Sequence, residues 1–199
     1  MHIDLLAFTG HKSLFGPQGT GGLYVRDGLE REIRPIMRGG TGSRSEREEQ
    51  PDFMPDCYES GTPNTVGVAG LDAGVGFVTA RGIENIRAHE ERLTGLFLAG
   101  VESIGGVKVY GPMDPSRRMP VVSIGLRGPD PAAVSLELDE RFGIMTRPGL
   151  HCAPAAHRTI GTYPSGTVRF SFGCFNTEGQ VGRALEAIRE LAERGRQAR

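Results

Sequence analysis

The spacing of apolar residues changes along the chain and predicts strands first and helices later. Residues 3–8 form a nearly unbroken apolar run, which is typical of a strand buried on both faces, and residues 22–26 form a shorter run of the same kind. The loop between them is rich in glycine, so its backbone can turn sharply and approach another group closely. Residues 27–58, rich in Arg, Glu, Pro and Gly, then predict a long loop.

Helical spacing begins near Thr62. Thr62 followed by Pro63 predicts a helix start, with Thr62 as the N-cap. The helix carries apolar residues on one face. An adjoining face would allow another element to pack closely, because it carries Gly67, Gly70 and Gly74.

From residue 83 onward short strands alternate with helices, which predicts an α+β domain. We therefore divide the chain into residues 1–82 and residues 83–199. The elements expected in the second part are helices over residues 83–104, 130–142 and 177–194, the last capped by Asn176, and strands over residues 107–110, 121–126, 144–146 and 168–172.

The composition is that of a globular chain. With 199 residues and 38% hydrophobic content it can bury a core, and a net charge of −1 without a dense basic run argues against a nucleic-acid partner. No apolar run has the length of a membrane span and the start resembles no signal peptide, so we expect no membrane partner and a cytoplasmic location. Three widely spaced cysteines fit neither a disulfide framework nor a C-x-x-C metal pattern, so we expect reduced thiols and no metal.

Lys12 lies in the glycine-rich loop between the first two expected strands. A lysine that such a loop desolvates has a lowered pKa, and its neutral amine can form a Schiff base; the alternative is an ordinary exposed loop lysine. The neighbours favour the first interpretation. Residues 9–12, Thr-Gly-His-Lys, and residues 16–25 closely resemble the cofactor-lysine segment of the class V aminotransferases, which are pyridoxal-phosphate enzymes of fold type I.

This resemblance implies an α/β fold and a cofactor. Residues 1–82 would be the C-terminal part of a fold type I large domain, which binds the cofactor, and residues 83–199 would be the small α+β C-terminal domain. Lys12 would bind pyridoxal 5'-phosphate covalently, with His11 and Thr9 near the cofactor phosphate.

The segment around Thr62 has a resemblance of its own. It is similar to the family's stretch whose threonine reaches across a dimer interface to the cofactor phosphate of the other subunit. That likeness implies a homodimer in which Thr62 binds phosphate. Judged on the residues alone, simple helix capping stays open as the alternative.

Cys152 has cationic neighbours in the sequence, namely Arg147, His151 and His157. Such neighbours stabilise a thiolate, which is the nucleophilic form of cysteine. The alternatives are a small buried apolar residue, or a metal site made with the two histidines, although the spacing matches no standard zinc pattern. The segment resembles the Arg-x-Gly-x-His-Cys-Ala sequence of the desulfurase branch that includes selenocysteine lyases. That branch uses the cysteine to accept sulfur, whereas Cys174 lies in no motif.

Arg169 lies inside an otherwise apolar expected strand and must find a partner, because a buried unpaired charge is very costly. Its planar guanidinium suits a carboxylate in bidentate fashion, and a structural ion pair with a protein carboxylate is the alternative. The strand resembles the family segment whose arginine holds the substrate carboxylate. We therefore expect Arg169, with Arg147, to bind the substrate.

Together the resemblances imply a pyridoxal-phosphate-dependent cysteine desulfurase that converts L-cysteine, or a related amino acid such as selenocysteine, to L-alanine. The sulfur would remain on Cys152 as a persulfide for a sulfur-acceptor protein. The family's residues around the cofactor ring lie upstream of the lysine strand. We therefore expect an incomplete gene product, a fragment, or one half of a split enzyme completed by a separate N-terminal half, with residues 3–8 exposing apolar faces.

Three other functions stay open. One is a different class V aminotransferase or lyase that does not need Cys152. Another is a cofactor-free sulfur carrier in which only Cys152 acts. The third is a non-catalytic interaction module or gene remnant.

Overall fold

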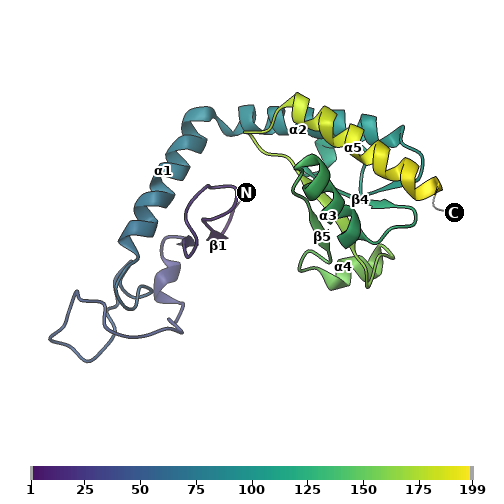
Figure 1. Cartoon of the computed structure of the whole chain (residues 1–199). Coiled ribbons are helices and arrows are strands. Elements are labelled where there is room, and N and C mark those ends of the chain that lie inside the picture. Colours follow the sequence, from purple (N-terminus) through teal and green to yellow (C-terminus); the bar gives the residue numbers. More distant parts are fainter. Residues whose placement is uncertain (1, 198–199) are drawn as a thin grey trace. The chain divides into compact units, whose positions relative to one another are not determined.

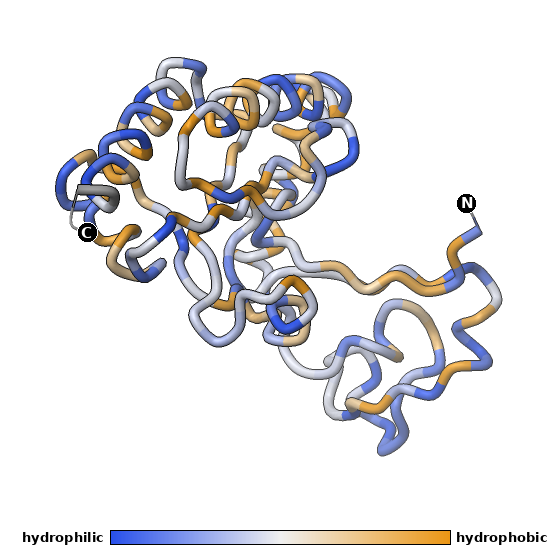
Figure 2. Tube along the Cα trace, turned by 90° about the vertical axis from the view of Figure 1, so that its right-hand side faces the viewer, coloured by the Kyte–Doolittle hydropathy of each residue, from blue (hydrophilic) through white to orange (hydrophobic). Residues whose placement is uncertain are grey.

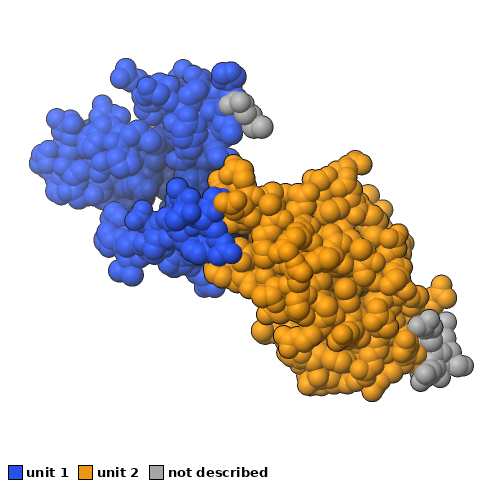
Figure 3. All heavy atoms as spheres, turned by 90° about the horizontal axis from the view of Figure 1, so that it is seen from above, with its two compact units in different colours: residues 1–82 blue, residues 83–199 orange. Residues whose placement is uncertain are grey.

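The computed structural model describes residues 2–197 and divides the chain into two compact units, residues 1–82 and residues 83–199. Figure 1 traces the elements of each unit, and Figure 3 distinguishes the units by colour. No single helix within residues 2–197 is long and apolar enough to cross a membrane; only α1 (Thr65–Arg81) and α2 (Ile83–Glu102) taken together reach that length and composition.

Unit 1 begins with an antiparallel pair, β1 (Leu5–Thr9) and β2 (Gly21–Val25), whose register places Leu5 opposite Val25. Every residue of β1 is exposed, so the expectation of a strand buried on both faces is wrong within residues 2–197. The reason is that β2 is the only strand paired with it there, so the apolar faces of the pair stay exposed. Figure 2 colours apolar residues orange in this part of the chain, near the N-terminus. The expected exposure of apolar faces is confirmed.

A 3-10 turn, η1 (Leu29–Arg31), and the long loop expected from the composition lead to α1. Its N-cap is not Thr62 but Asn64, whose side chain accepts a hydrogen bond from Gly67 N–H at 3.0 Å. Asn caps helices at least as well as Thr, and Asn64 stands at the right distance from the free N–H groups of the first turn.

The glycine face of α1 packs closely, as expected. A Cβ added at Gly74 would lie 2.3 Å from the carbonyl oxygen of Leu14, and one added at Gly70 would lie 2.5 Å from Pro17 Cγ. The helix therefore lies directly against the loop that carries Lys12.

Unit 2 contains a four-stranded antiparallel sheet in the order β3-β4-β6-β5. The strands β3 and β4 and the helix α3, which begins at Pro131 with the side chain of Asp130 as its cap, lie where they were expected. The bounds are β3 (Val107–Tyr110), η2 (Pro115–Arg117), β4 (Val121–Leu126), α3 (Pro131–Phe142), β5 (Arg147–Gly149), α4 (Pro154–Thr159), β6 (Thr167–Ser171) and α5 (Glu178–Gln197).

Three details of unit 2 differ from the prediction. The strand expected over residues 144–146 lies instead at β5, because pairing with β6 decides its position. The segment that forms the short helix α4 was expected to be a loop. The cap of α5 is Thr177 rather than Asn176. Thr177 and Gln180 form a capping box, with Gln180 N–H donating to Thr177 Oγ1 at 3.3 Å and Thr177 N–H donating to Gln180 Oε1 at 3.0 Å.

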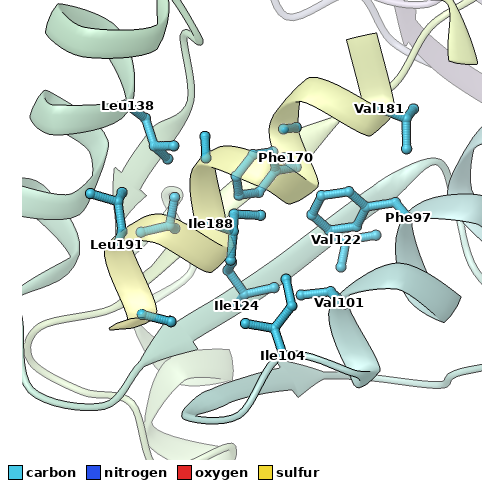
Figure 4. Close-up of a cluster of buried hydrophobic side chains, with 14 of the residues drawn as sticks. Phe97, Val101, Ile104, Val122, Ile124, Leu138, Phe170, Val181, Ile188 and Leu191 are labelled. Atoms are coloured by element: carbon cyan, nitrogen blue, oxygen red, sulfur yellow. The ribbon is translucent and has the colours of Figure 1, made fainter. Parts of the chain in front are cut away.

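Helices α2, α3 and α5 build the core against one face of this sheet, as Figure 4 shows. Because side chains alternate along a strand, Val168 and Phe170 of β6 enter the core while Arg169 points to the other face. That second face carries the candidate chemistry. The core residues that Figure 4 labels are Phe97, Val101, Ile104, Val122, Ile124, Leu138, Phe170, Val181, Ile188 and Leu191.

Candidate active site

The loop that carries Lys12 is held by its own backbone. Gly10 N–H donates to Thr20 O, and Gly16 N–H donates to Gly10 O, each at 2.8 Å. The buried Thr20 hydroxyl donates to Pro17 O at 2.6 Å. Lys12 itself is exposed, so the desolvation expected of it is not provided by the part of unit 1 that the structure describes.

Two other predicted residues, Thr9 at the end of β1 and His11, precede Lys12 in the chain. Thr9 Oγ1 is 2.9 Å from His11 Nδ1, and both side chains are exposed. Thr62 is exposed as well, in the segment before α1, which is tied to the long loop where Gly61 N–H donates to Gly40 O at 2.8 Å. Unit 1 thus offers an amine, an imidazole and hydroxyls to solvent.

Cys152 lies in unit 2 on a tight turn that follows β5. Ala153 N–H donates to Leu150 O at 2.8 Å, and the two residues between them, His151 and Cys152, have φ angles of 52° and 59°. Turns of this mirror-image kind favour Asn and Gly, and each ordinary residue in the left-handed region costs about 1–2 kcal/mol. The strained turn carries an exposed thiol, whereas Cys57 and Cys174 are buried.

The turn is bound to the strand before it. Arg147 Nη2 lies 3.3 Å from Cys152 Sγ, and His151 Nε2 lies 2.8 Å from Arg147 O. Since a carbonyl oxygen only accepts, His151 Nε2 carries a proton in this contact. Burial holds the pKa of His151 below its ordinary value. The hydrogen bond to the Arg147 carbonyl acts in the opposite direction, whereas the charge of Arg169 and those of other neighbours lower the pKa further. The cation in contact with the thiol is therefore Arg147.

Arg169 and Arg147 stand directly opposite each other on β6 and β5. Like charges in such a cross-strand pair repel, and none of the ion pairs within residues 2–197 includes either arginine. Arg169 Nε is also buried without a hydrogen-bond partner in that part of the chain. The structural ion pair considered as an alternative is thus not formed within the described residues, and the two guanidinium groups can hold an anion such as a carboxylate.

Unit 2 therefore gathers Arg147, His151, Cys152 and Arg169, while Lys12, Thr9, His11 and Thr62 belong to unit 1. In the described part of the chain, no three His, Cys, Asp or Glu side chains gather as metal ligands. The sequence reasoning missed a contact between His157 Nδ1 and Thr162 Oγ1 at 2.7 Å, and nothing in the sequence pattern pointed to that pairing.

Comparisons with known proteins agree on one family. The family model for class-V aminotransferases matches residues 1–183. A probable cysteine desulfurase of Methanothermobacter thermautotrophicus is 36% identical over 196 residues, which cover 96% of this chain and 48% of that protein. The cysteine desulfurase of Escherichia coli strain K12 is 34% identical over 195 residues, with 96% and 46% covered.

Solved structures give the same result. The apo cysteine desulfurase from Thermococcus onnurineus is similar with a TM-score of 0.86 at 33% identity, covering 96% of this chain and 48% of that one. The cysteine desulfurase CsdA of Escherichia coli has a TM-score of 0.83 at 28% identity, covering 96% and 46%. The chain thus spans about half the length of the curated relatives it matches.

Proposed function

Since this chain belongs to the class-V aminotransferase family, we propose that it contributes the lysine loop and the sulfur-accepting cysteine of a pyridoxal-phosphate-dependent cysteine desulfurase. One observation carries the proposal. The exposed Cys152 thiol contacts Arg147, and Arg147 is paired across the sheet with Arg169, an arginine without a carboxylate partner within residues 2–197. A thiol and two guanidinium groups thus lie together in unit 2, which supports a nucleophile beside a carboxylate site.

The residues of unit 2 would act as follows. Arg169 and Arg147 hold the α-carboxylate of L-cysteine, and the Cys152 thiolate attacks the substrate sulfur. The carbon–sulfur bond breaks, and its electron pair stays on the carbon, which takes up a proton and leaves as L-alanine. The sulfur remains on Cys152 as a persulfide. The names of the relatives support cysteine as substrate, and selenocysteine has the same carboxylate and the same point of attack.

The residues of unit 1 fit pyridoxal phosphate by their chemistry. Lys12 offers an exposed primary amine for an aldehyde cofactor, and Thr9, His11 and Thr62 offer polar groups for its phosphate. When bound, the cofactor supplies an electron sink for the carbon that loses the sulfur. Lys12 would hold the cofactor and move the α-proton of the substrate.

We further propose three partners. A second copy would form a homodimer, in which Thr62 serves the phosphate site of the partner. A polypeptide equivalent to the other half of the relatives would cover the apolar faces of β1, which are exposed on both sides. A sulfur-acceptor protein would take the persulfide from Cys152, whose exposed thiol supports such a transfer.

The test begins with the cofactor. The 199-residue chain is incubated with pyridoxal phosphate and reduced with borohydride, and the labelled peptide is located by mass spectrometry. We expect the label on Lys12, and its loss in Lys12→Arg but not in the matched Lys108→Arg. Scattered label would contradict cofactor binding by this chain alone.

The second test separates the enzyme classes. Alanine formation from cysteine is compared in the wild type, Cys152→Ala and the control Cys174→Ala. Loss of alanine only in Cys152→Ala supports the desulfurase. Turnover that survives Cys152→Ala would favour another class V aminotransferase or lyase, and persulfide accepted by Cys152 without cofactor would favour a sulfur carrier.

A further inference from the structure

The segment from Leu150 to Gly166 leaves the sheet after β5 and returns at β6, and one buried histidine joins its two halves. The main-chain N–H of His157 donates to Ala153 O at 3.1 Å, directly after Cys152. Its carbonyl oxygen accepts from Thr162 N–H at 2.9 Å, on the returning half. His157 is 4% exposed, and its Nδ1 lies 2.7 Å from Thr162 Oγ1.

The imidazole of His157 also reaches the reactive turn through His151. The two rings lie 5.3 Å apart between centroids. His151 in turn contacts the carbonyl oxygen of Arg147, and the guanidinium of Arg147 contacts the Cys152 sulfur. A left-handed turn of two ordinary residues persists only where its surroundings hold it, and His157 is a buried polar group among those surroundings.

We propose that His157, held by Thr162, is a positioning residue that keeps the His151–Cys152 turn in the conformation in which Arg147 contacts the thiol. The inference rests on the proposed function of Cys152 as the sulfur acceptor. His157 touches neither the sulfur nor the substrate; it acts through His151. Losing its anchor would let the turn relax and carry the sulfur away from Arg147.

The consequence is measurable without cofactor or substrate. Cys152 is already exposed, so the change that a looser turn brings is the loss of the Arg147 guanidinium beside the sulfur. A neighbouring cation of this kind favours the reactive thiolate form of a cysteine. We therefore measure iodoacetamide alkylation of Cys152 in the folded full chain by peptide mass spectrometry, at about pH 7 and again at about pH 10, above the ordinary thiol pKa.

The variants are His157→Phe and Thr162→Val, with Thr162→Ser as the conservative rescue. Thr159→Val is the matched control, because Thr159 lies exposed on α4, the helix that carries His157, and its hydroxyl donates to Ala155 O. We expect alkylation at pH 7 to slow on the order of threefold to tenfold in the first two variants only, and the difference to shrink at pH 10. Thr162→Val keeps the test decisive if His157→Phe does not fold.

Unchanged alkylation in Thr162→Val, with only a lower unfolding midpoint, would overturn the proposal, because His157 would then support the fold alone. Slower alkylation that persists at pH 10 would overturn the proposal too, since access to the thiol would then be blocked rather than its ionisation reduced. The assay needs no turnover, so failure of the desulfurase function would appear separately, as a wild type that is alkylated normally and forms no alanine.

Discussion

At the scale of single residues, Arg169 and Arg147 lie side by side at the expense of stability, which the carboxylate site proposed above would explain. They are direct cross-strand partners of like charge, and a pair of this kind is destabilising by a few tenths of a kcal/mol up to about 1 kcal/mol. Arg169→Met keeps an apolar stem of similar length and removes the repulsion. We expect this variant to raise the free energy of unfolding of the ligand-free chain by about 0.5 kcal/mol.

Urea unfolding measures this difference, with Arg127→Met at an exposed position as the control. A loss of stability in Arg169→Met, larger than in the control, would mean that Arg169 supports the fold and would count against a substrate role.

His151 makes stability depend on pH. Burial lowers its pKa, and the charges of Arg169, His157 and Arg147 act in the same direction. The unfolded chain therefore takes up a proton near the ordinary value of about 6.5, while the folded chain does not. The stability contributed by neutral His151 is fully present above the pKa of the unfolded chain. It is lost as the pH falls from that pKa towards the lowered pKa of the folded chain.

We expect the urea midpoint of the wild type to fall more steeply between about pH 7 and pH 5 than that of His151→Gln. The comparison isolates His151, because both proteins share the other titrating groups, including Glu90, whose pKa is raised by burial. Equal slopes in the two proteins would show that His151 is not the group responsible.

Residue types predict chemistry better than they predict conformation. The Cys152 thiol is exposed, and Arg169 Nε has no hydrogen-bond partner within residues 2–197, so neither of the purely structural alternatives considered for them is formed there, while their roles stay predictions. The left-handed φ angles of His151 and Cys152 could not be predicted, because residues other than glycine adopt that region in only a few per cent of cases. Asn64 was overlooked as a cap because Thr62 and Pro63 form an equally good local signal.

At the scale of elements, the segment that carries Cys152 depends on a close backbone approach at its two ends. A Cβ added at Gly166, where φ is +80°, would lie 2.1 Å from Gly149 O, whereas one added at Gly161, where φ is +74°, would meet nothing within 4 Å. Both alanine variants carry the left-handed strain, of about 1–2 kcal/mol. Only Gly166→Ala must also push two strands apart.

We therefore expect Gly161→Ala to cost about 1 kcal/mol in urea unfolding and Gly166→Ala clearly more, with faster hydrogen exchange at the β5–β6 pairing. Equal losses in the two variants would mean that the β5 end moves freely and does not constrain the cysteine segment.

Whether an element is defined by local signals or by distant pairing decides whether the sequence could predict it. Helices α2 and α3 were located nearly to the residue, because their apolar spacing and their terminal signals are local. Strand β5 was misplaced to residues 144–146, because a strand of three residues has no usable periodicity and its register comes from β6, far along the chain.

At the scale of the whole molecule, the two units differ in what stabilises them. Leaving proline and glycine aside, the buried apolar residues in the described part of the chain all lie between Leu93 and Ala192, in unit 2, except for Cys57. In β1, by contrast, Leu5 is 49% and Phe8 is 42% exposed. An apolar run predicts that something covers a strand, but it does not identify the segment or chain that does so. In unit 2 the covering helices belong to the unit itself, and for this reason the sequence described unit 2 more accurately than unit 1.

This difference predicts an uneven pattern of hydrogen exchange. A two-stranded hairpin without a covered face is marginally stable, so the amides of β1 and β2 should exchange on the order of 100-fold faster than those of β4 and β6, whose pairing is backed by the core.

Edge strand β3 is the matched comparison, because it is similarly short and pairs with one strand but has one face against the core. Protection of β1 equal to that of β3 would mean that another surface covers the hairpin in solution. A second copy of the chain would reveal itself by protection that weakens on dilution, whereas rapid exchange that slows only when a separate polypeptide is added would favour a chain equivalent to the other half of the relatives.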